Sequence, residues 1–253
     1  MDVRKQTVAN AMKKNVISII GDHYAQGPRD LCGLNNRLFI ELSELDPSTC
    51  WSVLSHGSLG GIKSVVNSTA DAFADMFSYE ADRYTAIIWV GVGESKSGGI
   101  PLDAWAGMLD HLICMVYAAD VDPILILPVV PPQEYADKNL RKWCRRAHKL
   151  AIEVANKREV RTLDLPLGPD SFVDLYALKA RTYQQIATEL GRSFFVGSKK
   201  QQSTPRLVSE PEVIYKHKSA KPAPIKRVET NNSENSVAIM QPDRVRSKRG
   251  AHG

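Results

Sequence analysis

Five short runs of apolar residues organise the first 195 residues of this chain. The runs occupy residues 15–20, 50–54, 84–90, 123–130 and 160–165. Near-continuous apolar runs of this length are typical of strands that are buried on both faces of a parallel sheet. We therefore predict five strands at these ranges.

The stretches between the runs have apolar residues at three- and four-residue spacing, which is typical of amphipathic helices. We predict helices over about 62–77, 105–116, 140–155 and 177–190, the last ending at Gly191, since glycine is favoured just beyond a helix. Alternating strands and helices predict an α/β fold, in which a five-stranded parallel sheet lies between two helical layers. The functional crevice of such a sheet lies beyond the carboxyl ends of its strands.

The loops that follow the strands carry a series of short motifs. They read Gly-Asp-His-Tyr at 21–24, Ser-Leu-Gly-Gly at 58–61, Gly-Val-Gly-Glu at 91–94, Pro-Val-Val-Pro-Pro at 128–132 and Asp-Leu-Tyr-Ala at 174–177. In this order, the loops resemble the sequence blocks of the SGNH (GDSL-type) hydrolases. The resemblance spans about 180 residues and implies the flavodoxin-like, three-layer αβα fold of that family.

The same resemblance implies what each position does, and three functional residues of the family are replaced. His23 stands in the place of the nucleophilic serine, Gly93 in that of the oxyanion-binding asparagine and Ala177 in that of the histidine base. Asp174 matches the aspartate of the triad, and Gly60 matches the glycine whose N–H binds the oxyanion. Further candidate crevice residues are Asp22, Tyr24, His56 and Glu94.

These replacements weaken the case for the family's reaction. Loss of a triad nucleophile or base costs about 10⁶ in turnover, and loss of one oxyanion donor costs about 10² to 10³. We therefore expect a domain that has lost serine-esterase activity and acts as a binding or scaffolding module, with an unknown protein or ligand at its crevice. An active acyl hydrolase remains an alternative, with His23 and Asp174 as a general-base pair or a differently placed serine. His56 or Glu94 could extend that pair to a partial metal site, although we expect no cofactor and no bound metal.

Charge adds a second possible function. The net charge is +5, but residues 199–253 alone hold 12 Lys and Arg against 5 Asp and Glu. This tail has repeated prolines and few large apolar residues, so we predict that it is disordered. A nucleic-acid-associated protein, like those of retroelements that carry esterase-like domains, is therefore another alternative. Its candidate contacts are Arg141, Arg145, Arg146, Lys199, Lys200, Arg244, Arg246, Lys248 and Arg249.

The expected organisation is an N-terminal extension over 1–14, the hydrolase-like domain over 15–196 and the tail over 197–253. No secretory signal and no run of about 20 apolar residues is visible, so we expect an intracellular protein that does not enter a membrane. The four cysteines have no metal-binding or redox spacing, which favours free thiols.

Overall fold

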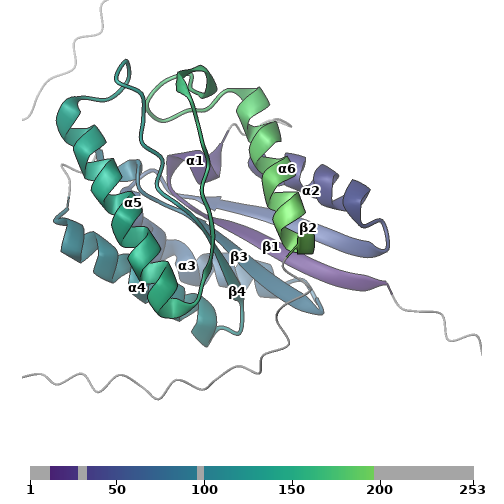
Figure 1. Cartoon of the computed structure of the whole chain (residues 1–253). Helices are drawn as coiled ribbons and strands as arrows, with labels where there is room; N and C mark the ends of the chain where they lie inside the picture. The colour runs from purple at the N-terminus through teal and green to yellow at the C-terminus, as the bar shows by residue number, and fades with distance from the viewer. Residues whose placement is uncertain (1–11, 28–32, 96–99, 197–253) are drawn as a thin grey trace, which may run out of the picture. The chain divides into compact units, whose positions relative to one another are not determined.

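A computed structural model of the chain describes residues 12–27, 33–95 and 100–196. Within them a parallel five-stranded sheet lies between two helical layers (Figure 1). The elements are, in chain order, β1 Lys13–Gly21, α1 His23–Gln26, α2 Leu34–Leu45, β2 Thr49–Gly57, α3 Gly61–Phe77, β3 Arg83–Trp89, α4 Leu102–Ala118, β4 Asp122–Ile126, α5 Lys138–Arg158, β5 Arg161–Leu163 and α6 Ala180–Val196. The predicted fold class is confirmed.

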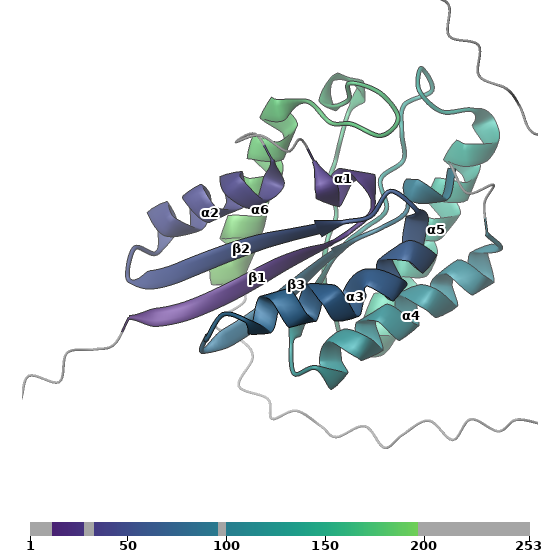
Figure 2. The same ribbon diagram turned by 180° about the vertical axis from the view of Figure 1, so that it is seen from behind.

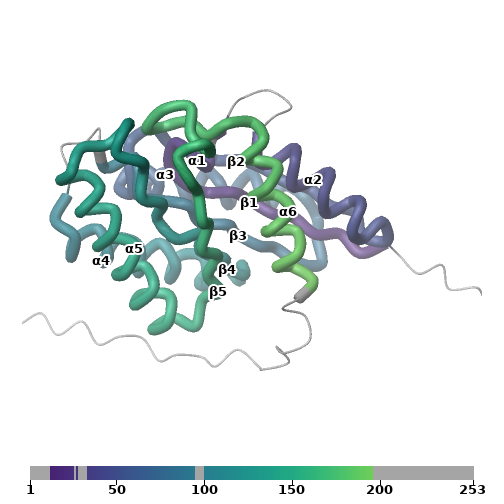
Figure 3. The backbone as a smooth tube through the Cα atoms, turned by 45° about the horizontal axis from the view of Figure 1, so that its top comes forward, coloured from purple at the N-terminus to yellow at the C-terminus, as the bar shows by residue number. Residues whose placement is uncertain are grey.

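The strands are ordered β2-β1-β3-β4-β5, so the chain reverses its direction of travel across the sheet between β1 and β3. Figure 3 follows the backbone through β4 to β5 at one edge of the sheet. In doubly wound sheets, a reversal of this kind leaves a crevice at the carboxyl ends of the two strands. We therefore expect a functional site at the loops after β1 and β3.

Each face of the sheet buries its own apolar core because successive strand residues point to opposite faces. On β1, Val16 and Ile20 pack with α3, α4 and α5, whereas Ile17 and Ile19 pack with α2 and α6. Figure 2 shows α3 and α4 on the near side of the sheet and α6 on the far side. The apolar runs of the sequence are thus continuous because both faces of the strands are covered.

The structure corrects several of the predicted boundaries and adds two helices, α1 and α2. The last helix does not stop at Gly191 but continues to Val196. A side chain at 191 would lie 2.7 Å from Glu41 Cγ and 3.1 Å from Leu45 Cδ1 of α2. This glycine permits close packing of two helices and does not end one. The strand predicted over 123–130 ends at Ile126, and α2 was not predicted at all.

Several predictions fall on residues that lie outside the described ranges. They are the disordered tail over 197–253 and its candidate contacts Lys199, Lys200, Arg244, Arg246, Lys248 and Arg249. Among the helices that are described, none combines the length and the apolar character that crossing a membrane requires.

Candidate functional site

Asp22 ties the loop after β1 to the loop after β3, at the point where the strand order reverses. Its side chain is fully buried, and its Oδ2 accepts hydrogen bonds from the backbone N–H groups of Gly91 (2.7 Å) and Gly93 (2.9 Å). Its own N–H donates to Trp89 O at the end of β3 (3.0 Å). The carboxylate therefore fixes the geometry of the crevice rather than facing into it.

The environment of Asp22 favours its neutral form. Burial raises the pKa of this carboxyl to about 6, and the nearby Glu94 carboxylate acts in the same direction, while the two backbone N–H groups oppose the shift. Oδ1 is buried without a hydrogen-bond partner among the described residues. An aspartate held in this way carries a proton at mildly acidic pH, where exposed aspartates are ionised.

Glu94 joins the loop after β3 to the start of α3. Its side chain is 3% exposed, and Oε1 accepts a hydrogen bond from Ile62 N–H at 2.6 Å. A carboxylate in this position compensates the unpaired N–H groups and the partial positive charge of a helix N-terminus. Gly61 makes this approach possible: it has a φ of +68°, and a Cβ there would lie 2.7 Å from Glu94 Oε1.

The position that matches the family's asparagine has no room for a side chain. A Cβ at Gly93 would lie 2.7 Å from the Cα and N of Gly61 and 3.2 Å from Asp22 Cβ. The loop after β3 thus packs closely against the first residue of α3 at this point. Gly60, the expected oxyanion donor, directs its N–H toward Ser58 Oγ at 3.4 Å.

His23 begins α1 and is 8% exposed. Its ring lies against Tyr176, with ring centroids 4.8 Å apart. Next to it, the buried Tyr24 donates a hydrogen bond from its hydroxyl to Leu175 O (2.7 Å). Two consecutive residues of α1 therefore attach to the loop that precedes α6, where the family's histidine and aspartate are found.

Asp174 and Ala177 lie together in that loop, and Asp174 is exposed. Asp174 Oδ1 accepts hydrogen bonds from the N–H groups of Tyr176 (2.7 Å) and Ala177 (2.9 Å). This arrangement is an Asx turn, which stabilises the backbone locally. The pairing of Asp174 with His23 stays a prediction. No three His, Cys, Asp or Glu side chains of the described residues are grouped so that they could hold a metal ion.

His56, another candidate crevice residue, has both of its ring nitrogens engaged elsewhere. Nδ1 lies 2.9 Å from Ser18 Oγ, and Nε2 lies 3.0 Å from Asp75 Oδ2 on α3. The order Ser-His-Asp is that of a catalytic triad. However, Ser18 is 0% exposed in the middle of β1, so its hydroxyl cannot reach an ester.

Sequence reasoning missed two partners in this region. Tyr176 lies in the Asp-Leu-Tyr-Ala motif, and an aromatic residue inside a motif that was already singled out was a usable signal. The Ser18–His56–Asp75 chain gave no signal, because its members lie on two strands and a helix. Ser18 and His56 come together only because Ser18 pairs with Leu54, two residues before His56.

No family model matches the sequence, and no curated protein matches it. Solved structures do match. A carbohydrate acetylesterase from Sinorhizobium meliloti is 12% identical with a TM-score of 0.58, over 73% of this chain and 99% of that one. An acetyl xylan esterase is 13% identical with a TM-score of 0.59, over 70% of this chain and 98% of that one. The aryl esterase of M. smegmatis is 11% identical with a TM-score of 0.59, over 72% of this chain and 99% of that one. The chain therefore has an SGNH hydrolase-like fold, which confirms the predicted resemblance at the level of the fold.

Proposed function

We propose that this SGNH hydrolase-like domain has lost serine-ester hydrolysis and acts as a binding or scaffolding module. The observation that carries the proposal is the lack of room at Gly93, the residue that we match to the family's oxyanion-binding asparagine: a Cβ there would lie 2.7 Å from the Cα and N of Gly61. Position 23 supports it, because a buried histidine packed against Tyr176 replaces an accessible hydroxyl. Position 177 supports it further, because alanine cannot act as a base.

A fluorophosphonate probe tests this proposal, since it forms an adduct only with serines that are activated as nucleophiles. We expect intact-mass spectrometry to find no adduct after exposure, while an active serine esterase in the same tube is labelled to completion. The test includes Ser18, whose hydrogen-bonded His56 and Asp75 would activate it if solvent reached it. An adduct on any serine of this chain would contradict the proposal.

The basic face of α5 favours a second function, binding to the phosphate backbone of nucleic acid. Six Lys and Arg residues lie between 138 and 149, and the first acidic residue of the helix is Glu153. Lys138, Lys142, Arg145 and Lys149 follow one another at four-, three- and four-residue spacing, so they form one stripe. All four are exposed and form no ion pair with a described residue.

This stripe does not help the helix to fold. Cations in the first turns of a helix oppose its macrodipole at a cost of about 0.3–1 kcal/mol each, and like charges at i,i+4 add about 0.2–0.5 kcal/mol. Arg141 differs from the stripe, because its Nε donates to Pro131 O (3.1 Å). A row of unpaired cations that destabilises its own helix supports an anionic partner, and successive phosphates match such a row.

Salt dependence tests this second function. Four phosphate contacts to single-stranded RNA predict a contribution of about −3 to the slope of log K against log salt, about −0.7 for each contact. The double variant Lys142→Gln/Arg145→Gln should therefore make the slope less steep by about 1.4. Lys157→Gln is the matched control, because Lys157 lies on the same helix and pairs with Asp110 (3.5 Å). An unchanged slope in the double variant, or no binding to RNA, excludes this surface.

A further inference from the structure

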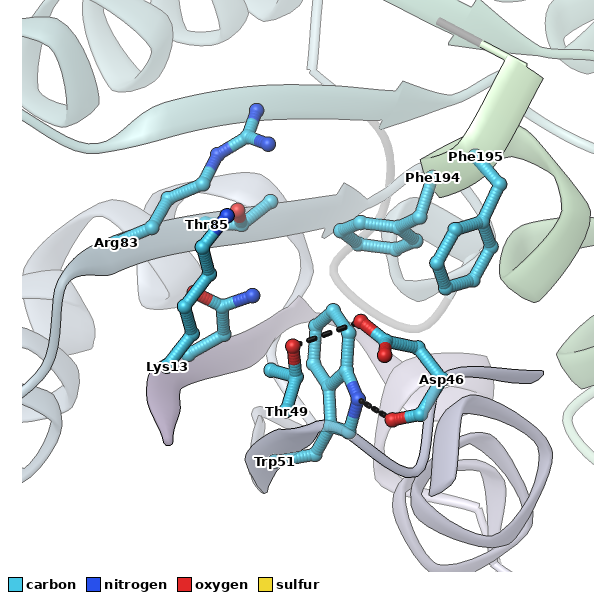
Figure 4. Close-up of a pocket in the computed structure, with 9 residues that line it drawn as sticks. Lys13, Asp46, Thr49, Trp51, Arg83, Thr85, Phe194 and Phe195 are labelled. Atoms are coloured by element: carbon cyan, nitrogen blue, oxygen red, sulfur yellow. Dashed lines mark hydrogen bonds between the residues drawn. The ribbon is translucent and has the colours of Figure 1, made fainter. Parts of the chain in front are cut away.

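A small cavity lies at the end of the sheet opposite to the crevice. It is formed by the first residues of β1, β2 and β3, by the end of α2 and by the last turn of α6 (Figure 4). Its volume is about 140 Å³. We call it the basal pocket, because parallel strands place their amino ends at the edge of the sheet that is farthest from the crevice.

Aromatic rings form one side of the basal pocket. Trp51 and Phe194 are mostly buried, and Phe195 is 38% exposed. The rings of Phe194 and Phe195 meet the Trp51 indole nearly at right angles, at centroid distances of 6.1 and 6.4 Å. Figure 4 shows the three rings on the same side of the pocket. They offer a planar guest both faces and edges to pack against.

Polar side chains form the opposite side. Lys13, Asn15 and Thr85 line the pocket, and their side chains make no hydrogen bond or ion pair with any described residue. Thr85 is only 2% exposed, so its hydroxyl has access to little except the pocket. Lys13 is exposed and Asn15 is half-buried, so these side chains have polar groups to offer a ligand in the pocket.

The charge of this side is positive. Arg83 lines the pocket beside Lys13, and its guanidinium also pairs with Asp122 (2.7 Å). Arg161 lies 6.0 Å from the centre of the Phe194 ring, and burial together with the neighbouring Arg83 lowers its pKa. Lys13 and Arg83 therefore give this side of the pocket a positive charge, with Arg161 close by, and this arrangement favours an anion.

The one carboxylate that lines the basal pocket among the described residues is already in use. Asp46 accepts hydrogen bonds from the hydroxyls of Ser48 (2.5 Å) and Thr49 (2.7 Å), and the first of these is the main cause of its lowered pKa. Its carbonyl accepts from Trp51 Nε1 (3.4 Å). Asp46 thus holds the turn before β2 and the Trp51 indole in place. Its carboxylate oxygens already accept hydrogen bonds from Ser48 and Thr49.

We propose that the basal pocket binds a small anion that carries one planar ring, with the ring against Trp51 and Phe194 and the anionic group toward Lys13 and Arg83. The volume sets the size of the ring, because an apolar cavity of about 150 Å³ holds one benzene molecule. Asn15 and Thr85 supply hydrogen bonds to polar atoms of the guest. Aryl carboxylates and aryl phosphates both have this chemistry. The site is separate from the crevice and from the basic face of α5.

Indole NMR resonances of the full chain test the proposal, with benzoate and phenyl phosphate as probes. The chain has four tryptophans, and Trp51→Phe identifies the Trp51 signal by its loss. We expect millimolar probe to shift the Trp51 signal and to leave those of Trp89, Trp105 and Trp143 in place. A response to only one of the two probes identifies the anionic group and supports the site. No shift with either probe overturns it.

Two adjacent lysines provide a matched pair of variants. Lys13→Gln should weaken binding about threefold to fivefold, as expected for a partly exposed charge pair. Lys14→Gln should leave binding unchanged, because Lys14 points to the other face of β1 and pairs with Glu80 (3.5 Å). Benzyl alcohol and cyclohexanecarboxylate, which lack the charge and the planar ring respectively, should bind more weakly than benzoate. Equal effects of the two lysine variants, or equal binding of either analogue, would contradict the proposal.

Discussion

Asp22 holds together the loops of the crevice through its buried carboxylate. Its carboxylate holds two backbone N–H groups of the loop after β3, so it is needed for the shape of the crevice whatever the crevice binds. This arrangement is costly in free energy, because full burial disfavours the ionised form of the Asp22 carboxyl. The residue therefore has a structural role that does not depend on catalysis.

The raised pKa of Asp22 predicts a pH dependence of stability. The folded pKa of about 6 exceeds the ordinary value of 3.8, so folding favours the protonated form. Its stabilising effect is complete below pH 3.8 and is lost as pH rises through 6, by about 3 kcal/mol in all. Urea unfolding from mildly acidic to neutral pH measures this effect. The free energy of unfolding of the wild type should decline over this range, and the decline should be smaller by this amount in Asp22→Asn. Parallel curves for the two proteins would exclude this effect.

The contact at Gly93 predicts that even the smallest side chain is not tolerated there. Gly93→Ala places a methyl group against the backbone of Gly61, and overpacking of this kind costs about 1–3 kcal/mol. Gly107→Ala is the control, because a Cβ at that exposed position of α4 meets no atom within 4 Å. The control should stabilise the protein by about 0.5–1 kcal/mol. Chemical denaturation measures the free energy of unfolding of both variants. Equal changes in the two variants would contradict the prediction, because they would mean that the backbone at Gly93 can move away from Gly61.

At the level of elements, α4 and α5 are joined by an ion pair between Asp110 and Arg158. Arg158 Nε and one terminal nitrogen donate to the two oxygens of Asp110, at 2.7 and 2.8 Å, and both side chains are 24% exposed. The hydrogen bonds from Arg158 lower the pKa of Asp110. A bidentate, partly buried pair of this kind is stronger than an ordinary surface pair.

Asp110→Asn should therefore lower the free energy of unfolding by about 1–2 kcal/mol at neutral pH. The contribution of the pair is present above the ordinary aspartate pKa and is lost as pH falls through the lowered folded value. The difference between variant and wild type should thus shrink in acid. Glu189→Gln, which removes the exposed pair with Arg192 (3.3 Å), is the control and should change stability little at either pH. A difference that stays constant with pH would show that the ion pair is not its source.

The elements also show which parts of the fold the sequence predicts. Strands such as β1 and β3 were found because both faces are buried, which leaves a continuous apolar signal. The helix α2 was missed because its buried residues are only Leu34, Leu38 and Leu42, while Phe39 and Ile40 of the same helix are exposed. Gly191 was misread because its role is to let two helices approach, and contacts between distant segments leave no local pattern.

The same reason limits prediction of the sites. Motifs identified the crevice residues individually, because each follows a strand directly. The contacts of Gly93 with Gly61 and of His23 with Tyr176 depend on how loops pack together, which spacing does not encode. The basal pocket was not predicted, because its residues come from alternate positions at the starts of three strands and from the end of α6.

For the molecule as a whole, the two ends of the sheet have opposite characters. At the carboxyl end, the loops after β1, β2 and β3 pack against one another through Asp22, Gly61, Gly93 and Glu94. At the amino end, the same three strands begin with polar residues that line a cavity. Contacts between loops thus dominate the described part of the carboxyl end, whereas a pocket lies among the first residues of the strands at the amino end.

Hydrolysis of p-nitrophenyl acetate by the wild type and by His23→Ala tests the central claim most directly, because the sequence resemblance matches His23 to the nucleophile of the family. If the crevice has lost its chemistry, neither protein will raise the rate of hydrolysis above that of the uncatalysed reaction. Turnover by the wild type that His23→Ala abolishes would show instead that the crevice is still an active site, and would contradict the loss of ester hydrolysis.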